Sequence, residues 1–170
     1  MAMSDIERLL AIEEIKRLRA RYCRFLDTKR WADLPALFTP DAEFWGFASC
    51  PDGSSFEGWR DGVKSRLSDV VMFHHCHSPD IVFLDDMTAR AVWAMEGYLE
   101  WPEPLGLAEA PEARGLRGFG HYQDEYRFED GNWKIAHIRF CTMRMGTLHT
   151  SMPKQALPTA PVQSGWLPDE

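Results

Sequence analysis

Residues 73–81 read Phe73-His74-His75-Cys76-His77-Ser78-Pro79-Asp80-Ile81, and three of the six histidines of the chain fall within four consecutive positions here. Histidine has the side-chain pKa closest to neutrality, so such a cluster indicates proton transfer or metal binding. The cluster lies inside a longer segment, residues 71–83, whose period-two alternation predicts a β-strand. On a regular strand His75 and His77 share one face, and His74 occupies the other.

Downstream of this strand the sequence predicts further strands at residues 88–101, 118–128 and 132–145. The last two are joined through Glu129-Asp130-Gly131, where Asp-Gly is a strong hairpin signal. Residues 102–116 carry three prolines and are predicted to form a loop.

Upstream, Ser4 and Glu7 form a capping box that begins a helix running to about Asp27. Shorter helices are predicted at residues 31–38 and 58–69, on either side of an aromatic strand at residues 42–48. Helices followed by antiparallel strands indicate an α+β fold. We expect a cone-shaped α+β barrel, with three N-terminal helices packed on a strongly curved antiparallel sheet around a pocket. Residues 1–146 would form this single domain, and residues 147–170 an extended proline-rich tail.

The composition is that of an ordinary globular domain, with 170 residues, 45% of them hydrophobic. A net charge of −7 argues against nucleic acid and anionic membrane surfaces as partners. Asp5 and Glu7 interrupt the N-terminus where a signal peptide needs an apolar run, so we expect a cytoplasmic protein. The four cysteines are widely spaced, and in a reducing compartment they are expected to be buried thiols.

Four segments taken together resemble one known family. They are residues 21–31, residues 74–81, residues 88–93, and residues 120–126 with 131–133. The chain resembles the SnoaL-like division of the nuclear transport factor 2-like superfamily, and within it the bile-acid dehydratase and scytalone dehydratase relatives. The resemblance implies a cone of three helices and a curved antiparallel sheet, a cofactor-free site inside the cone, and a homo-oligomer, either a dimer or a trimer.

The resemblance also implies the catalytic residues. The family's Tyr and Asp on the first helix correspond to Tyr22 and Asp27, and its catalytic His corresponds to His74. A further Asp of the bile-acid dehydratases falls at Gly97, so one family carboxylate is missing here. Glu96 is adjacent, but on a regular strand its side chain points to the opposite face.

The residues themselves support this assignment. Asp27 follows Tyr22 by five positions, so the two lie on one side of the helix. A carboxylate near a histidine orients the ring, and a Tyr hydroxyl polarises a carbonyl or protonates a leaving group. The alternative is that Asp27 caps the helix end and Tyr22 is a core residue.

Further side chains are candidates for substrate binding. His77 is the second choice among the clustered histidines, and Glu96 stands out as a carboxylate in an apolar strand, either functional or salt-bridged. Of the neighbours His121 and Tyr122, at most one can face the pocket. Trp45 and Trp93 would form apolar walls, and Arg139 would suit an anionic group. A metal site at His75-Cys76-His77 lacks a second ligand pair, so we expect no metal.

The leading functional hypothesis is a cofactor-independent lyase, a dehydratase above all, or an isomerase acting on a small hydrophobic cyclic substrate. In it His74 removes a proton next to a carbonyl, Asp27 orients His74, and Tyr22 assists the oxygen. One alternative is a non-catalytic ligand-binding or subunit module, like the small subunit of ring-hydroxylating dioxygenases. Another is a polyketide-cyclase-like enzyme that uses the same pocket.

Overall fold

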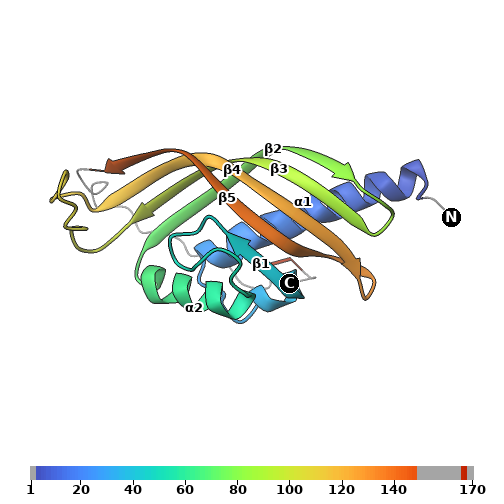
Figure 1. Cartoon of the computed structure of the whole chain (residues 1–170), viewed down its shortest axis with the longest axis horizontal. Coiled ribbons are helices and arrows are strands. Elements are labelled where there is room, and N and C mark those ends of the chain that lie inside the picture. The colour runs from blue at the N-terminus through green and yellow to red at the C-terminus, as the bar shows by residue number, and fades with distance from the viewer. Residues whose placement is uncertain (1–2, 149–165, 168–170) are drawn as a thin grey trace.

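The computed structural model describes residues 3–148 and 166–167. Two α-helices and five strands make up the described chain, with one 3-10 turn between them (Figure 1). In chain order they are α1 (Asp5–Asp27), the 3-10 turn η1 (Leu34–Leu37), β1 (Phe38–Trp45), α2 (Phe56–Leu67), β2 (Val71–Phe83), β3 (Thr88–Glu100), β4 (Gly115–Glu129) and β5 (Asn132–Leu148). The strands form one sheet in the order β1-β5-β4-β3-β2. The α+β fold expected from the sequence is confirmed.

The first helix begins where the capping box predicts. The backbone N–H of Ser4 donates to Glu7 at 2.8 Å, and the backbone N–H of Glu7 donates to the Ser4 hydroxyl at 3.3 Å. Ile15 and Tyr22 are fully buried, whereas Ile6 is 72% exposed because the first turns of α1 project beyond the sheet (Figure 1). Arg19 also faces the interior, although an arginine side chain is rarely fully buried.

The helix expected at residues 31–38 is wrong, and with it the count of three N-terminal helices. Only the 3-10 turn Leu34–Leu37 is helical, with Pro35 in its first turn, where the missing N–H of proline is tolerated. Phe38 already has extended backbone angles and pairs with Ile135 of β5. Pairing with the sheet overrides the local helical preference here.

The sheet is mixed, so the expected all-antiparallel arrangement is wrong at one edge. β1 pairs with β5 in parallel, and the other pairs, β2–β3, β3–β4 and β4–β5, are antiparallel. A parallel pair needs a long crossover, and the whole of α2, β2, β3 and β4 lies between β1 and β5 in the chain.

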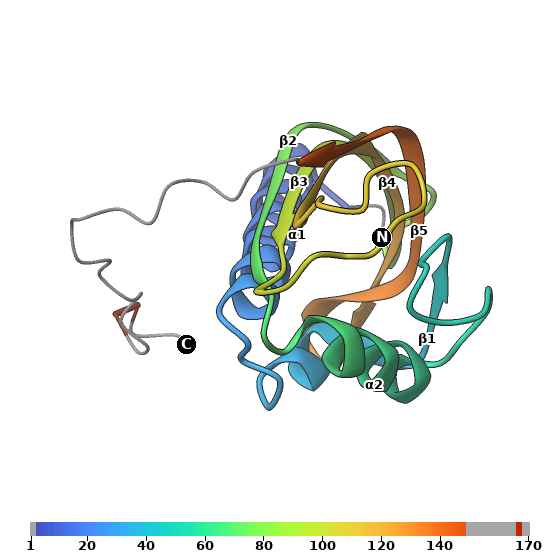
Figure 2. The same cartoon turned by 90° about the vertical axis from the view of Figure 1, so that its left-hand side faces the viewer.

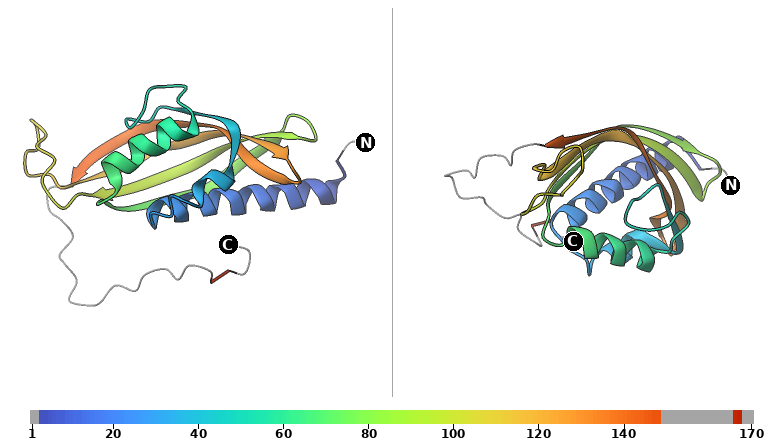
Figure 3. Two further views of the ribbon diagram at one scale, coloured as in Figure 1. Left: turned by 90° about the horizontal axis from the view of Figure 1, so that it is seen from below. Right: turned by 60° about the vertical axis from the view of Figure 1, so that its left-hand side comes forward.

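Irregularities in pairing accompany the strong bend of the sheet. The register shifts between His77 and Asp80, where Ser78 adopts a positive φ of 47°, and again twice between β4 and β5. Such bulges bend and twist the strands that carry them. Both helices lie on the concave side (Figures 2 and 3), where α1 contacts β2 and β5 and α2 contacts β1.

The last strand passes the residue, 146, at which the domain is predicted to end. The last strand continues to Leu148. Apart from Thr147 and Leu148 at the end of β5 and the exposed Trp166 and Leu167, the predicted tail lies outside the described residues. Among the residues that the structure describes, no helix is long and apolar enough to span a membrane.

Candidate active site

Asp27 and His74 form a hydrogen-bonded pair between the last residue of α1 and the inner face of β2. Asp27 Oδ1 lies 2.6 Å from His74 Nδ1, and Asp27 Oδ2 accepts a 2.9 Å hydrogen bond from the backbone N–H of His74. An ionised carboxylate only accepts hydrogen bonds, so beside such a carboxylate Nδ1 carries the proton, and in the neutral ring Nε2 then keeps a free lone pair. This is the arrangement of a general base oriented by a carboxylate.

The position of Asp27 favours this role over the alternative of a helix cap. A carboxylate at a helix C-terminus faces the negative end of the helix dipole, which is unfavourable by roughly 0.3–1 kcal/mol. Thr28 is the C-cap residue, and its hydroxyl donates to the Arg24 carbonyl at 2.6 Å. Both oxygens of Asp27 contact His74 instead.

Helix α1 and strand β2 bring their side chains together in successive pairs. Residues four apart on a helix are separated by about 6 Å along its axis. Residues two apart on a strand are separated by about 6.6–6.8 Å. The repeats nearly match, so Asp27 meets His74 and, one repeat away, Cys23 Sγ lies 3.6 Å from Cys76 Sγ.

A cavity of about 180 Å³ lies between the two helices and the inner face of the sheet, and His74 borders it. Its walls are mostly apolar or aromatic and include Phe47, Trp59, Leu99, Trp101, Tyr122 and Phe140. The side chain of His74 is 9% exposed and that of Asp27 19%. The pair is therefore mostly buried, and His74 is the member that a ligand in the cavity would meet.

Two donors on residues that line this cavity have no hydrogen-bond partner within the described chain. They are the Tyr22 hydroxyl and Trp59 Nε1, whose rings stack at 5.9 Å. An unsatisfied buried polar group costs about 1–3 kcal/mol, and an oxygen atom of a ligand would satisfy either donor. Burial raises the pKa of Tyr22 well above its usual value, so its hydroxyl stays protonated and acts as a donor.

A buried ion pair supports the ring of Tyr22 from behind. The Arg19 guanidinium lies 4.5 Å from the Tyr22 ring centroid and 3.9 Å from that of Tyr122. Its Nη1 atom is 3.3 Å from Asp124 Oδ2, and both side chains are fully buried. Tyr126 donates a 2.6 Å hydrogen bond to the same carboxylate oxygen. Burial raises the pKa of Asp124, and the charge of Arg19 opposes that rise.

Four of the residues predicted from the sequence come together at this site. Tyr22, His74 and Tyr122 line the cavity, and Asp27 lies behind His74. Tyr122 is buried while its neighbour His121 is partly exposed on the outer face of the sheet, as strand alternation requires.

The other predicted substrate-binding residues lie away from the cavity. His77 is exposed on the outer face of β2 because it shares that face with His75, and Cys76 between them turns toward α1. Glu96 also faces outward and forms an ion pair with Arg117 at 2.7 Å, so of its two predicted roles the salt-bridged one is observed.

The remaining predicted wall and anion-binding residues have structural contacts of their own. Arg139 lies over the ring of Trp45, 4.9 Å from its centroid, and neither residue lines the cavity. Trp93 is buried in the core, where its Nε1 donates to the Tyr126 hydroxyl at 3.0 Å. None of these three residues is positioned to hold a ligand in the cavity.

The sequence did not reveal most of the cavity walls, and Trp59, which has a donor without a partner in the described chain, is the most informative of the missed residues. It lies on α2 with Phe56 and Val63, and all three are buried at helical spacing. In the sequence, this spacing indicates that the three residues belong to the core-facing side of a helix. It does not reveal that Trp59 also borders a void.

Gly97 lies beside the ring of His74, with Met95 close to it. It pairs with His74 across β2 and β3, and a Cβ atom at this position would lie 3.8 Å from His74 Cδ2. A carboxylate side chain at position 97, where the related dehydratases are expected to have one, would therefore lie beside the imidazole of His74. The pair therefore contains a single carboxylate, that of Asp27, and Gly97 lines the cavity together with His74 and Met95.

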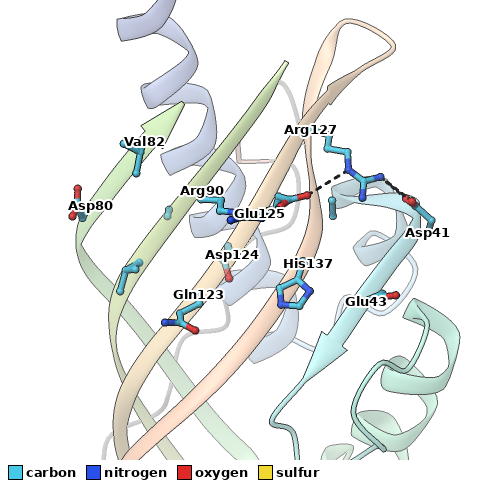
Figure 4. A pocket seen from close by; sticks show the side chains of 13 residues that line it. Asp41, Glu43, Asp80, Val82, Arg90, Gln123, Asp124, Glu125, Arg127 and His137 are labelled. Carbon is cyan, nitrogen blue, oxygen red and sulfur yellow. Dashed lines mark hydrogen bonds and ion pairs between the residues drawn. The ribbon is translucent and has the colours of Figure 1, made fainter. Parts of the chain in front are cut away.

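A second, more polar depression lies on the outer face of the sheet, on the side away from α1 (Figure 4). Its charged groups are largely paired with one another, since Arg127 contacts Asp41 at 2.8 Å and Arg90 contacts Glu125 at 2.9 Å. The depression contains His137 but no carboxylate hydrogen-bonded to it among the described residues. The inner cavity is the stronger candidate.

Replacing Asp27 with alanine is expected to release the His74 ring from its single tautomer. In the wild-type protein long-range proton–nitrogen NMR correlations should show His74 protonated on Nδ1. In the variant both tautomers should be populated, because no carboxylate then holds the Nδ1 proton. His75, which is exposed, provides the internal reference. An unchanged His74 pattern in the variant would show that Asp27 does not control the ring.

Comparison with known proteins agrees with this architecture. The sequence profile described as the SnoaL-like domain matches residues 7–139. The probable cyclase FGR4 from Gibberella zeae is 22% identical over 137 residues, which cover 74% of this chain and 86% of that protein.

Solved structures resemble the chain at the level of the fold. A protein assigned as a scytalone dehydratase, from Novosphingobium aromaticivorans, superposes with a TM-score of 0.71 at 18% identity, covering 90% of this chain and 97% of the other. The hexachlorocyclohexane dehydrochlorinase LinA type 2 superposes with a TM-score of 0.73 at 19% identity, covering 89% and 100%. With the profile match over most of the chain and the cone-like fold, this protein belongs to the SnoaL-like domain family of the nuclear transport factor 2-like fold.

Proposed function

We propose that this chain is a cofactor-independent lyase or isomerase that acts on a small, hydrophobic, cyclic substrate, with loss of water as its leading reaction. The observation that carries the proposal is the Asp27–His74 pair at the edge of an apolar cavity. A histidine that only fills the core does not need a carboxylate that binds both its ring and its backbone N–H. A general base must keep one orientation, and these two contacts provide it.

The first step assigned to the site is removal of a proton from a carbon next to a carbonyl group. His74 Nε2 takes the proton, and the imidazolium that forms is stabilised by Asp27 at 2.6 Å. The electron pair of the broken C–H bond moves toward the carbonyl, giving an enolate. In a cavity with little water, the charge of Asp27 acts on the imidazolium at low dielectric.

The second step concerns the two oxygen atoms of the substrate. Tyr22 and Trp59 have free donors and would hold the carbonyl oxygen as negative charge develops on it. The enolate then expels a hydroxyl group from the next carbon. The proton held by His74 goes to that hydroxyl, so the products are an unsaturated ketone and water. Without a leaving group, return of the proton to another carbon gives an isomerisation.

The cavity indicates the substrate class. A cavity of about 150 Å³ is known to hold benzene, so about 180 Å³ accommodates one compact ring with small substituents. Aromatic walls such as Trp101 and Phe140 suit a flat, apolar ring. Two of the structural relatives are named for eliminations, of water and of hydrogen chloride, which supports an elimination here.

The test uses two readouts on a panel of cyclic hydroxy-ketones and the matching simple ketones. In heavy water, NMR should show faster exchange of the protons next to the carbonyl when the protein is present. On the hydroxy-ketones, ultraviolet absorbance should report the conjugated product. Binding of these compounds with neither exchange nor elimination would contradict the proposal and favour a non-catalytic binding module.

A cyclase reaction is the second candidate, because the curated relative FGR4 is named for one. The same enolate would attack a carbonyl group within the same molecule and close a ring. Product mass separates cyclisation without water loss from dehydration, since only dehydration lowers the mass by one water.

Replacing Tyr22 with phenylalanine separates the functional role of this residue from a structural one. The hydroxyl has no partner in the described chain, so its removal should leave the free energy of unfolding unchanged or raise it. Loss of one donor to a developing oxyanion should lower the exchange rate by about 10²–10³-fold. Thermal melting and the exchange assay together decide the matter, because a purely structural Tyr22 would leave the rate intact.

A further inference from the structure

Next to the proposed site, the thiols of Cys23 and Cys76 form a close pair. Their sulfur atoms lie 3.6 Å apart, joining α1 to the edge strand β2. Both cysteines are free. Cys23 is buried and Cys76 partly exposed, and both line a groove between the helix and the strand. A small solute can therefore reach the pair from this groove.

A buried positive charge lies next to the pair. None of the three guanidinium nitrogens of Arg19 makes a hydrogen bond to the described residues, and the side chain is fully buried. The hydrogen bond from Cys23 is the largest influence that favours a thiolate at Cys76, and the charge of Arg19 adds to it, whereas burial of the thiol and, more weakly, Asp124 on β4 act in the opposite direction. Together they lower the pKa of the Cys76 thiol to about 6.

We propose that Cys23 and Cys76 form a redox-active pair that hydroperoxides oxidise to a disulfide between α1 and β2. The Cys76 thiolate attacks one peroxide oxygen, the O–O bond breaks, and Cys76 becomes a sulfenic acid while hydroxide leaves. The Cys23 thiol then attacks the Cys76 sulfur, the S–S bond forms and water leaves. Two thiols and one hydrogen peroxide thus give one disulfide and two waters, and the peroxide is reduced by two electrons.

The location of the pair links this modification to the proposed site. Asp27 lies one helical repeat beyond Cys23, and His74 lies one strand repeat before Cys76. A disulfide bond is about 2.05 Å long, so the sulfurs must approach from 3.6 Å. Resting on the proposed function, we expect this approach to shift Asp27 against His74. A misplacement of this kind can lower turnover by about 10²-fold.

The test uses the full chain with Cys50→Ser and Cys141→Ser, which leaves only the pair. After hydrogen peroxide at neutral pH and quenching with N-ethylmaleimide, the intact mass should be lower by two hydrogens with no maleimide added. Peptide mapping should join Cys23 to Cys76, and a thiol reductant should reverse the change. A trapped sulfenic acid without the crosslink, or two thiols that stay unoxidised, would overturn the proposal.

A matched variant and a pH profile sharpen the result. With Cys23→Ser added, Cys76 should stop at the sulfenic acid, which dimedone traps. In the two-cysteine protein, alkylation of Cys76 by iodoacetamide should be half-maximal near pH 6, because the thiolate is the reacting form. A midpoint of about 8.5, as for a free thiol, would contradict the influence of Cys23 and Arg19 on the Cys76 thiol.

The catalytic consequence has its own readout. The exchange rate of the oxidised protein should fall and recover on reduction, and the Cys23→Ser variant should show no such reversible loss. If the disulfide forms but the exchange rate is unchanged, the proposed effect on catalysis is refuted, whereas the proposal of a redox-active pair is supported. If no substrate is turned over at all, the mass readout still decides on the pair.

Discussion

Replacing His74 with glutamine should lower proton exchange and elimination by about 10²–10⁴-fold, the usual contribution of a general base. Glutamine is close to histidine in size and can still donate a hydrogen bond to Asp27, so the local packing is kept. It has no basic nitrogen to replace Nε2. The exchange assay in heavy water measures the effect without requiring that the natural leaving group is known.

The matched control is His75→Gln. His75 is the next residue on the same strand, is exposed, and faces away from Asp27. Its replacement should leave the exchange rate within about twofold, because His75 does not face the cavity. The fold should also be kept, since a surface change of this kind rarely alters stability by more than about 0.5 kcal/mol. Equal losses in both variants, or activity retained in His74→Gln with an unchanged melting temperature, would refute the assignment of His74 as the base.

Replacing Arg19 with methionine should lower the free energy of unfolding by about 3–5 kcal/mol, the cost of leaving one member of a buried ion pair without its partner. Arg19 and Asp124 are both fully buried, and their contact at 3.3 Å joins α1 to β4. Methionine keeps most of the volume of arginine but none of its charge. Chemical denaturation, followed by Trp fluorescence, measures the loss.

Two controls separate charge from packing. Arg90→Met breaks an ion pair with Glu125 in which Arg90 is 63% exposed, and it should change stability by about 0–1 kcal/mol. Adding Asp124→Asn to Arg19→Met removes the uncompensated carboxylate and should recover part of the loss. If the double variant is no more stable than the single one, packing rather than charge accounts for the effect.

Elements governed by local signals were predictable from the sequence. β2 spans Val71–Phe83 as the period-two pattern indicates, and the capping box at Ser4 begins α1. The hairpin between β4 and β5 turns at Asp130 and Gly131, with φ of 55° and 79°. These backbone angles favour Asp and Gly, so the signal is contained in two residues.

Elements that depend on distant partners were not predictable in the same way. Residues 31–38 have a helical pattern, yet Phe38 pairs with Ile135, almost a hundred positions away. Charged side chains are normally exposed to solvent, whereas Arg19 is fully buried. It is buried because Asp124, Tyr22 and Tyr122 surround it, and no local pattern encodes that environment.

For the candidate site, the sequence alone determined the chemistry available and much of its placement. The family resemblance selects Tyr22, Asp27 and His74, and strand alternation separates His74 from His75 and His77. Only the tertiary structure decided that Asp27 reaches His74, that Trp59 has a free donor beside the cavity, and that Cys23 meets Cys76. Alternation and helical spacing determine the direction of a side chain within its own element. Which side chain it meets depends on how a helix and a strand dock, and that is set by the packing of the whole core.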